Sequence, residues 1–287
     1  MSYANRASLA MNMPKLYLSI VSDGMAQNHC ILPWLGNLAQ IKGVPQHIQG
    51  VLRHGRGLTL YRTFHNVANG ANLQLHTFLL ILEETIEEEG KLPDTVFFQF
   101  DGGSENTSKT VFLMCELIIA RGLTKKIVLT RLMVGHTHSD IDGVFGRLWT
   151  SIRSCHVHTQ EAYRAMMIQS LSTEAYNAKV VDIYAIPDYD GILRHHIDSK
   201  FGRYCKQELT QLQFTFEAVG VSDNFPLGVK TTYRAYASTD DLFEIIKDPN
   251  ATLGMRARTM RAKTLPEKTD TEVEGEGHIC LLVACMF

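Results

Sequence analysis

The stretch LMVGHTHSDIDGVFG, residues 132–146, decides how the rest of the chain is interpreted. It overlaps the end of an apolar run, residues 126–134, whose pattern predicts a buried strand. Gly135 breaks that strand. The side chains that can bind a metal ion then follow within a few positions, and they are His136, His138, Asp140 and Asp142.

The spacing of apolar residues changes after Asp142. Phe145, Trp149 and Ile152 recur at helical spacing, which predicts a helix that begins near Asp140 and buries this face. Asp142 lies three residues before Phe145, so its carboxylate is expected near the buried side of the first turn. An acid between the C-terminal end of a strand and the next helix is placed for binding a ligand rather than for solvation.

Composition restricts the function without identifying it. A length of 287 residues allows one large domain or two small ones. The net charge of -2 argues against a strongly basic, nonspecific nucleic-acid binder, although local basic patches stay open. The 6 cysteines are scattered without a Cys-x-x-Cys motif, which indicates reduced thiols in an intracellular protein. No apolar run approaches the ~18 residues of a membrane helix, so no membrane partner is expected.

The apolar patterns predict alternating strands and helices in the first half of the chain. Expected strands, in order, cover residues 15–23, 46–53, 58–64, 95–101 and 126–134. Helices are expected between the third and fourth strands, between the fourth and fifth, and after the fifth. The first of these helices, residues 73–90, has an acidic face from Glu83 to Glu89, which is interpreted as solvated.

The second half of the chain gives weaker signals. A helix is expected over 159–172 and strands over 180–186 and 212–219, with 228–237 as a partner of the last strand. Residues 254–268 form a basic loop, and residues 269–276 are acidic and expected to be disordered. The prediction is a smaller α+β C-terminal extension over residues 156–287.

Three aspartates share one position in these patterns. Asp23, Asp101 and Asp142 each lie at or just beyond the C-terminal end of a predicted strand. Where adjacent strands end at one edge of a sheet, three carboxylates repel one another unless cations neutralise them. Hard oxygen ligands suit Mg²⁺ or Mn²⁺, and two such ions about 4 Å apart stabilise an in-line phosphoryl displacement.

Three segments resemble those of a known family. These are YLSIVSDGM (residues 17–25), FQFDGGSEN (98–106) and VGHTHSDID (134–142). Together with the order of elements, they resemble the ribonuclease H-like catalytic core of DDE transposases and retroviral-type integrases, in the form found in transposon-derived eukaryotic proteins. The resemblance covers roughly residues 5–155. It implies an α/β fold with a mixed five-stranded sheet flanked by helices, as a catalytic core over residues 12–155.

The resemblance also implies an activity and a set of partners. Asp23, Asp101 and Asp142 take the catalytic, metal-binding positions for two Mg²⁺ or Mn²⁺ ions, and the reaction cuts or joins DNA phosphodiesters. The protein is expected to act as a homo-oligomer on DNA ends in the nucleus, with a site-specific DNA-binding domain further upstream. The third acid is Asp rather than the commoner Glu, and the gap between Asp101 and Asp142 is longer than usual.

Some roles stay open at this stage. Asp140 is an alternative third ligand, but Asp142 is preferred because it aligns with Phe145. His136 and His138 either bind metal or phosphate, or hydrogen-bond to the acidic loop. Basic residues that are candidates for DNA contacts are Lys109, Arg131, Arg147, Arg153, Arg256, Arg258, Arg261 and Lys263.

Two other functions compete with this one. The run His136-Thr-His-Ser-Asp140 also resembles the zinc-binding H-x-H-x-D run of metallo-β-lactamase-type hydrolases. Ile141 stands where that family has a further His, and the preceding elements follow the wrong order for that fold. The other alternative is a domesticated, catalytically inactive module that binds DNA or protein.

Overall fold

The structure is a computed structural model that describes residues 3–36, 43–100, 108–131, 140–173, 176–193, 212–222 and 225–235. The elements up to residue 131 are α1 (Tyr3–Asn12), β1 (Tyr17–Gly24), the 3-10 helix η1 (Gln27–His29), β2 (Ile31–Leu32), β3 (Val44–Arg53), β4 (Gly57–Phe64), α2 (Ala71–Glu89), β5 (Thr95–Phe100), α3 (Lys109–Ala120) and β6 (Lys126–Arg131). The later elements are α4 (Asp140–Arg153), α5 (Gln160–Leu171), β7 (Ser172–Thr173), β8 (Tyr176–Ile183), β9 (Leu212–Ser222) and β10 (Phe225–Ala235).

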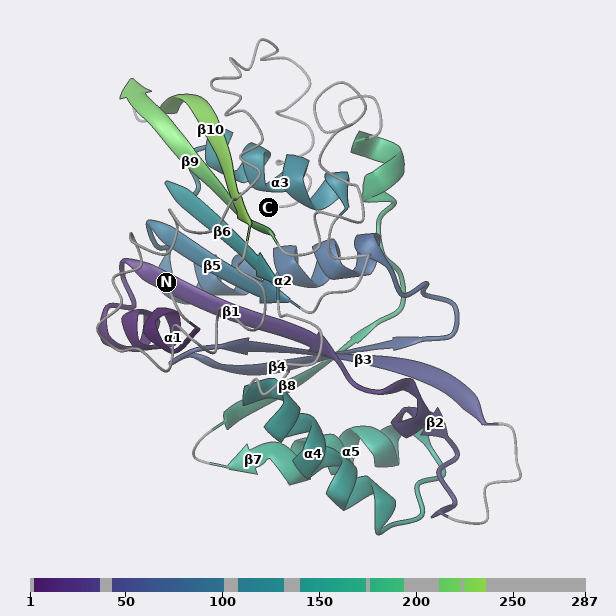
Figure 1. The fold of residues 1–287 in the computed structure, drawn as a ribbon. Helices are drawn as coiled ribbons and strands as arrows, with labels where there is room; N and C mark the ends of the chain where they lie inside the picture. The colour runs from purple at the N-terminus through teal and green to yellow at the C-terminus, as the bar shows by residue number, and fades with distance from the viewer. Residues whose placement is uncertain are drawn as a thin grey trace.

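The described strands form a mixed sheet in the order β10-β9-β6-β5-β1-β3-β4-β8-β7, with β2 paired to β3. Strands β1, β5 and β6 run parallel, whereas β1, β3 and β4 form an antiparallel meander. At the edges, β8 runs parallel to β4 and β9 runs antiparallel to β6. Helices lie on both sides of this sheet (Figure 1), which confirms the expected mixed α/β architecture.

The sheet is larger than the five strands expected from the first half of the sequence. Those five strands are contiguous, in the order β4-β3-β1-β5-β6, and strands from beyond residue 155 extend both edges. Helix α1 was not predicted, because its buried residues are Arg6, Ala7 and Ala10 rather than a stripe of large apolar side chains. The predicted β9–β10 pairing is confirmed by the observed antiparallel hairpin.

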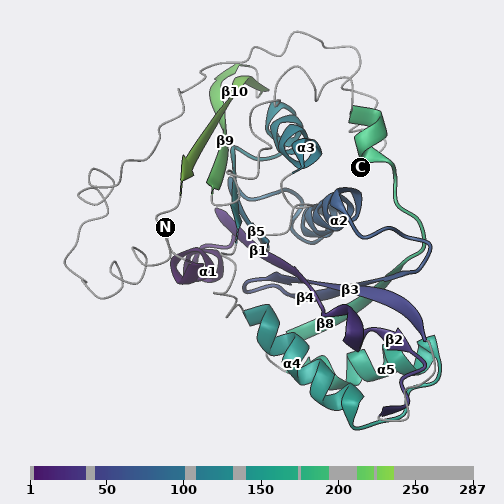
Figure 2. The ribbon, with the colours of Figure 1, turned by 45° about the vertical axis from the view of Figure 1, so that its right-hand side comes forward.

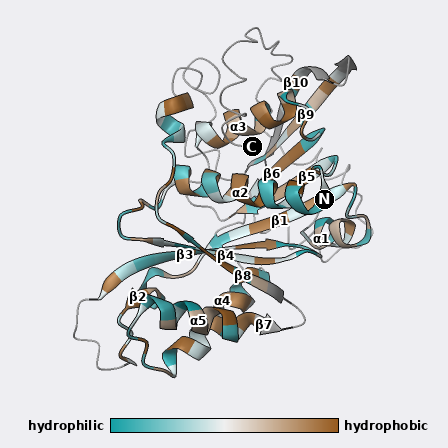
Figure 3. Cartoon of the chain, turned by 180° about the vertical axis from the view of Figure 1, so that it is seen from behind, coloured by the Kyte–Doolittle hydropathy of each residue, from teal (hydrophilic) through white to brown (hydrophobic). Residues whose placement is uncertain are grey.

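Alternation along β1 divides its side chains between two cores. Leu18 and Ile20 pack into a large apolar cluster with α2 and α3, and Val21 packs into a second cluster with α4 and α5. Arg6 of α1 lies over the ring of Phe97 on β5, on the same side as α4. Figure 2 shows the resulting layers, with α2 and α3 on one face and α1, α4 and α5 on the other. In Figure 3, α2, α4 and α5 carry both hydrophilic and hydrophobic residues, as expected of helices that bury one face.

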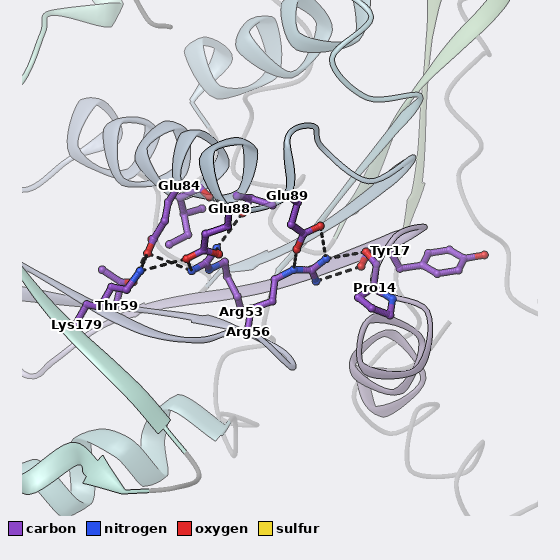
Figure 4. A network of polar contacts seen from close by, with 11 residues as sticks. Pro14, Tyr17, Arg53, Arg56, Thr59, Glu84, Glu88, Glu89 and Lys179 are labelled. Carbon is purple, nitrogen blue, oxygen red and sulfur yellow. Dashed lines mark hydrogen bonds and ion pairs between the residues drawn. The ribbon is translucent and has the colours of Figure 1, made fainter.

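The acidic face of α2 is attached to the sheet by ion pairs. Arg53 is only 2% exposed, and its guanidinium contacts Glu84 at 3.2 Å and Glu88 at 2.7 Å. Further contacts join Lys179 to both of these glutamates and Arg56 to Glu89 (Figure 4). We call this set of residues, Arg53, Arg56, Glu84, Glu88, Glu89 and Lys179, the α2 clamp. The prediction of a purely solvated acidic face is therefore wrong for Glu84, Glu88 and Glu89.

Candidate functional site

The C-terminal ends of the three parallel strands, β1, β5 and β6, lie side by side at one end of the sheet. Ser22 of β1 pairs with Phe100 of β5, and Phe100 pairs with Arg131 of β6. Asp23 directly follows Ser22, so it lies where the strands end. The predicted ligand Asp101 and the histidines His136 and His138 lie outside the described residues.

The side chain of Asp23 is on the face of the sheet that α4 covers. Asp23 is two residues after Val21 on the strand, so both side chains are on the same face, and Val21 packs into the α4 cluster. Asp23 also pairs with Gly50 of the neighbouring strand β3. The carboxylate is half-buried, and its Oδ1 accepts a hydrogen bond of 2.8 Å from the backbone N–H of Gly24. The strand therefore directs this acid toward the α4 layer.

Helix α4 passes directly beneath the Asp23–Gly50 pair. A Cβ atom at Gly50 would lie 3.0 Å from the ring of Phe145 and 3.4 Å from Cδ1 of Ile141. A Cβ atom at this position would be in tight contact, so the Phe145 ring would have to shift by a few tenths of an ångström to admit it. Asp142 is half-buried and lies three residues before Phe145, so it is on the side of the first turn of α4 that carries Phe145.

Asp140, the first residue of α4, contacts a different set of residues. Its Oδ2 accepts a hydrogen bond from the hydroxyl of Tyr3 at 2.7 Å and lies 3.4 Å from Nε2 of His54. Nδ1 of His54 in turn lies 3.0 Å from Oγ of Ser19 on β1. Burial lowers the pKa of His54, and the hydrogen bond and charge of Asp140 oppose this shift. Asp140 is therefore held between α1 and the end of β3.

A polar cleft of about 190 Å³ opens at the end of β1. Its lining consists mainly of polar groups from β1, β3 and the start of α2, and comprises Ser22, Asp23, Gly24, Met25, Ala26, Gln27, His47, Gln49, Asn69 and Gln74. Nε2 of Gln49 donates to Oγ of Ser22 at 2.8 Å, and the carboxamides of Gln49 and Gln74 also contact each other. The sequence analysis did not predict these polar residues as the lining of a cleft. Gln49 could have indicated it, because it is a polar residue inside a predicted strand.

The basic residues predicted to contact DNA are only partly described. Arg147 and Arg153 are exposed on α4. Lys109 begins α3 and Arg131 ends β6, but their side chains are outside the described part of the structure. The predicted basic residues Arg256, Arg258, Arg261 and Lys263 lie beyond residue 235, outside the described residues.

The donor set at the strand ends has the chemistry of a site for a hard divalent cation. Asp23 and Asp142 supply carboxylate oxygens, which Mg²⁺ and Mn²⁺ prefer. Among the described residues, no three His, Cys, Asp or Glu side chains gather closely enough to hold a metal ion. Asp101, the third predicted carboxylate, lies outside the described residues, so the three-carboxylate ligand set stays a prediction.

Fold and cleft define a mixed α/β protein with a polar, carboxylate-bearing site at the end of its central strands. The chain belongs to the DUF7869 family, a domain of unknown function, which matches residues 37–220. Asp101 and Asp142 lie inside the matched residues, whereas Asp23 lies before them. No curated protein matches the chain. None of the helices in the described ranges is long and apolar enough to cross a membrane.

Proposed function

We propose that the protein is a ribonuclease H-like nuclease or strand transferase of the DDE transposase type, which cuts or joins DNA phosphodiesters. The observation that carries the proposal is the placement of α4 beneath the end of β1. Phe145 contacts Gly50, the strand partner of Asp23, so α4, the helix that carries Asp142, packs against the end of the sheet where Asp23 lies.

The order of the central strands supports the same proposal. An antiparallel meander, β1-β3-β4, continues through β1 into the parallel strands β5 and β6. This order is what the resemblance to ribonuclease H-like cores implies for the first five strands. Asp101 directly follows Phe100, the last residue of β5, in the chain, and we propose that it is the third carboxylate at this end of the sheet.

The proposed chemistry assigns distinct tasks to the residues. Asp23, Asp101 and Asp142 would hold two Mg²⁺ or Mn²⁺ ions, which supply the activation of water or a 3′-hydroxyl and the stabilisation of the leaving oxygen. Asp23 is oriented by the N–H of Gly24 and by the end of β1. Asp142 is oriented by the packing of Ile141 and Phe145 beneath β3. The polar cleft beside Asp23 provides neutral hydrogen-bonding groups for the substrate.

A nicking assay on supercoiled plasmid with added Mn²⁺ or Mg²⁺ tests this function. We expect the parent protein to nick DNA, and Asp23→Asn, Asp101→Asn and Asp142→Asn each to reduce nicking at least ~100-fold because a metal ligand is lost. Asp94→Asn is the matched control, because Asp94 pairs with Lys125 at the opposite end of β5. Equal nicking by the parent and Asp142→Asn would refute the catalytic proposal.

The DNA partner is tested separately, because a non-catalytic module could bind DNA without cutting it. Charge reversal at Arg147 and Arg153 on the exposed side of α4 should weaken DNA binding. It should also flatten the salt dependence of binding, by about 0.9 in slope for each DNA phosphate that the variant no longer neutralises. Binding by a parent protein that never nicks DNA would favour the inactive module. A homo-oligomer on DNA ends and a nuclear location are further parts of this proposal.

A further inference from the structure

A chain of hydrogen bonds ties the first turn of α4 to α1 and β1. The hydroxyl of Tyr3 donates to Oδ2 of Asp140 at 2.7 Å and lies 3.0 Å from Nε2 of His54. On the other side of the imidazole, Nδ1 of His54 is 3.0 Å from Oγ of Ser19. We call Tyr3, Ser19, His54 and Asp140 the α4 latch. Ser19 and His54 are buried, whereas Asp140 is 54% exposed.

One assignment of protons satisfies the side-chain bonds of the α4 latch, while Nδ1 of His54 then gives no hydrogen to the Ser19 carbonyl oxygen 3.3 Å away. Ser19 donates its hydroxyl hydrogen to Nδ1 of His54, and Nε2–H of His54 is directed at the Tyr3 and Asp140 oxygens. This assignment needs a neutral imidazole, which agrees with the lowered pKa that burial causes at His54. The α4 latch is therefore a directed set of hydrogen bonds with one negative charge, on Asp140.

The α4 latch and the proposed metal site lie at different points along β1. Ser19 precedes Asp23 by four residues, which corresponds to about 13 Å along a strand. Asp140 is held toward Ser19, while Phe145, one turn further along α4, contacts the strand partner of Asp23. Asp140 is thus directed toward the first half of β1, whereas Phe145 on the same helix contacts the strand partner of Asp23.

We propose that Asp140 is a positioning residue rather than a metal ligand. Held by Tyr3 and His54, it fixes the first turn of α4 so that Asp142 faces the end of β1. This inference rests on the proposed function, and it selects Asp142 over Asp140 as the third ligand. Asp140 affects the reaction only through the backbone of α4.

Substitutions at the two acids separate a ligand from a positioning residue. Asp140→Asn keeps an oxygen that accepts from Tyr3, so nicking by this variant should stay close to that of the parent. Asp140→Ala removes the acceptor, and the Mn²⁺ concentration for half-maximal nicking should rise about 10-fold, with the rate at saturating Mn²⁺ largely retained. Asp142→Asn should be inactive at every Mn²⁺ concentration. An inactive Asp140→Asn variant, together with an active Asp142→Asn variant, would overturn the assignment.

A second experiment tests the α4 latch without using nuclease activity. Tyr3→Phe and Asp140→Ala are combined, and the midpoints of urea denaturation are compared in a double-mutant cycle. The shifts should be non-additive, because either substitution alone removes the same hydrogen bond. Tyr3→Phe combined with Asp94→Ala is the control, and these shifts should add because Asp94 lies outside the α4 latch.

The two experiments distinguish failure of the α4 latch from failure of the proposed function. Additive shifts for Tyr3→Phe and Asp140→Ala would overturn the α4 latch, whether or not the protein cuts DNA. Non-additive shifts in a parent protein that does not cut DNA would support the α4 latch and overturn the nuclease function. Non-additive shifts together with an active Asp140→Asn variant would support both.

Discussion

Arg53 and His54 are neighbours in the chain, yet they attach helices to opposite faces of the sheet. Arg53 is buried and charged, and it joins α2 through two glutamates in the α2 clamp. His54 is buried and neutral in the proposed proton assignment, and it joins α4 through the α4 latch. Both helices also bury apolar residues, so the two sides differ in their polar contacts, which are ion pairs at α2 and hydrogen bonds at α4. The proposed ligand Asp142 lies on α4, the helix that the α4 latch attaches.

The largest effect is expected from the α2 clamp. Arg53→Met keeps most of the side-chain volume but leaves Glu84 and Glu88 without their shared guanidinium, so we expect a loss of about 3 kcal/mol in the free energy of unfolding. Lys125→Met is the control, because its pair with Asp94 is exposed and contributes about 0.5 kcal/mol or less. Both values are measured by urea denaturation. Similar losses for the two variants would show that the buried pairs of Arg53 contribute no more to stability than an exposed ion pair.

A pair of glycines tests the packing of α4 against β3. Gly50→Ala places a Cβ atom 3.0 Å from the Phe145 ring, so we expect a destabilisation of about 1 to 2 kcal/mol. Gly146 lies on α4, and a Cβ atom added there would have no heavy atom within 4 Å. Because alanine has a higher helix propensity than glycine, Gly146→Ala should stabilise the protein by about 1 kcal/mol. The measurement is urea denaturation of both variants. A neutral Gly50→Ala would show that α4 moves away from the sheet easily.

The sequence predicted the parts of this fold that depend on periodic apolar residues. The central strands and the start of α4 at Asp140 followed from such periods, because burial on one face imposes spacing. Helix α1 could not be predicted, since it buries Arg6 and two alanines rather than large apolar residues. The role of Glu84 could not be predicted either, because its partner Arg53 is distant in sequence and no local pattern records that ion pair.

The sequence predicted candidate site residues but not the contacts that hold them. Asp23 and Asp142 were selected because each lies beside a predicted strand or helix boundary, and the structure brings their elements to one edge of the sheet. The contacts of Asp140 with Tyr3 and His54 were beyond sequence reasoning, because they depend on how three separate elements pack. The roles of Asp101, His136 and His138 remain predictions.

A smaller effect is expected at the α4 latch. Tyr3→Phe removes one hydroxyl that donates to a half-exposed carboxylate, so the loss in the free energy of unfolding should be about 1 kcal/mol. Hydrogen exchange should increase in the first turn of α4 and stay unchanged in α2, because the α2 clamp does not involve Tyr3. Increased exchange in both helices would mean that the two attachments are not independent.

The smallest effect is expected in the acid dependence of the α2 clamp. The hydrogen bond from Arg53, supported by Lys179, lowers the pKa of Glu88 below its ordinary value of 4.5, although burial opposes this shift. The lowered pKa means that the ion pairs of Glu88 contribute to stability above pH 4.5 and that this contribution is lost as the pH falls through the folded-state pKa. We therefore expect Glu88→Gln to flatten the decline of stability below pH 4.5.

The control for this experiment is Glu87→Gln, which changes an exposed acid on the same helix. Unfolding free energies of the parent, Glu88→Gln and Glu87→Gln are compared by urea denaturation at a series of pH values below 5. A parent and a Glu88→Gln variant with equal slopes would mean that Glu88 is solvated rather than paired in solution. In that case the α2 clamp would lose Glu88 and keep its pairs at Glu84 and Glu89, and the contrast with the α4 latch would rest on the buried Arg53–Glu84 pair.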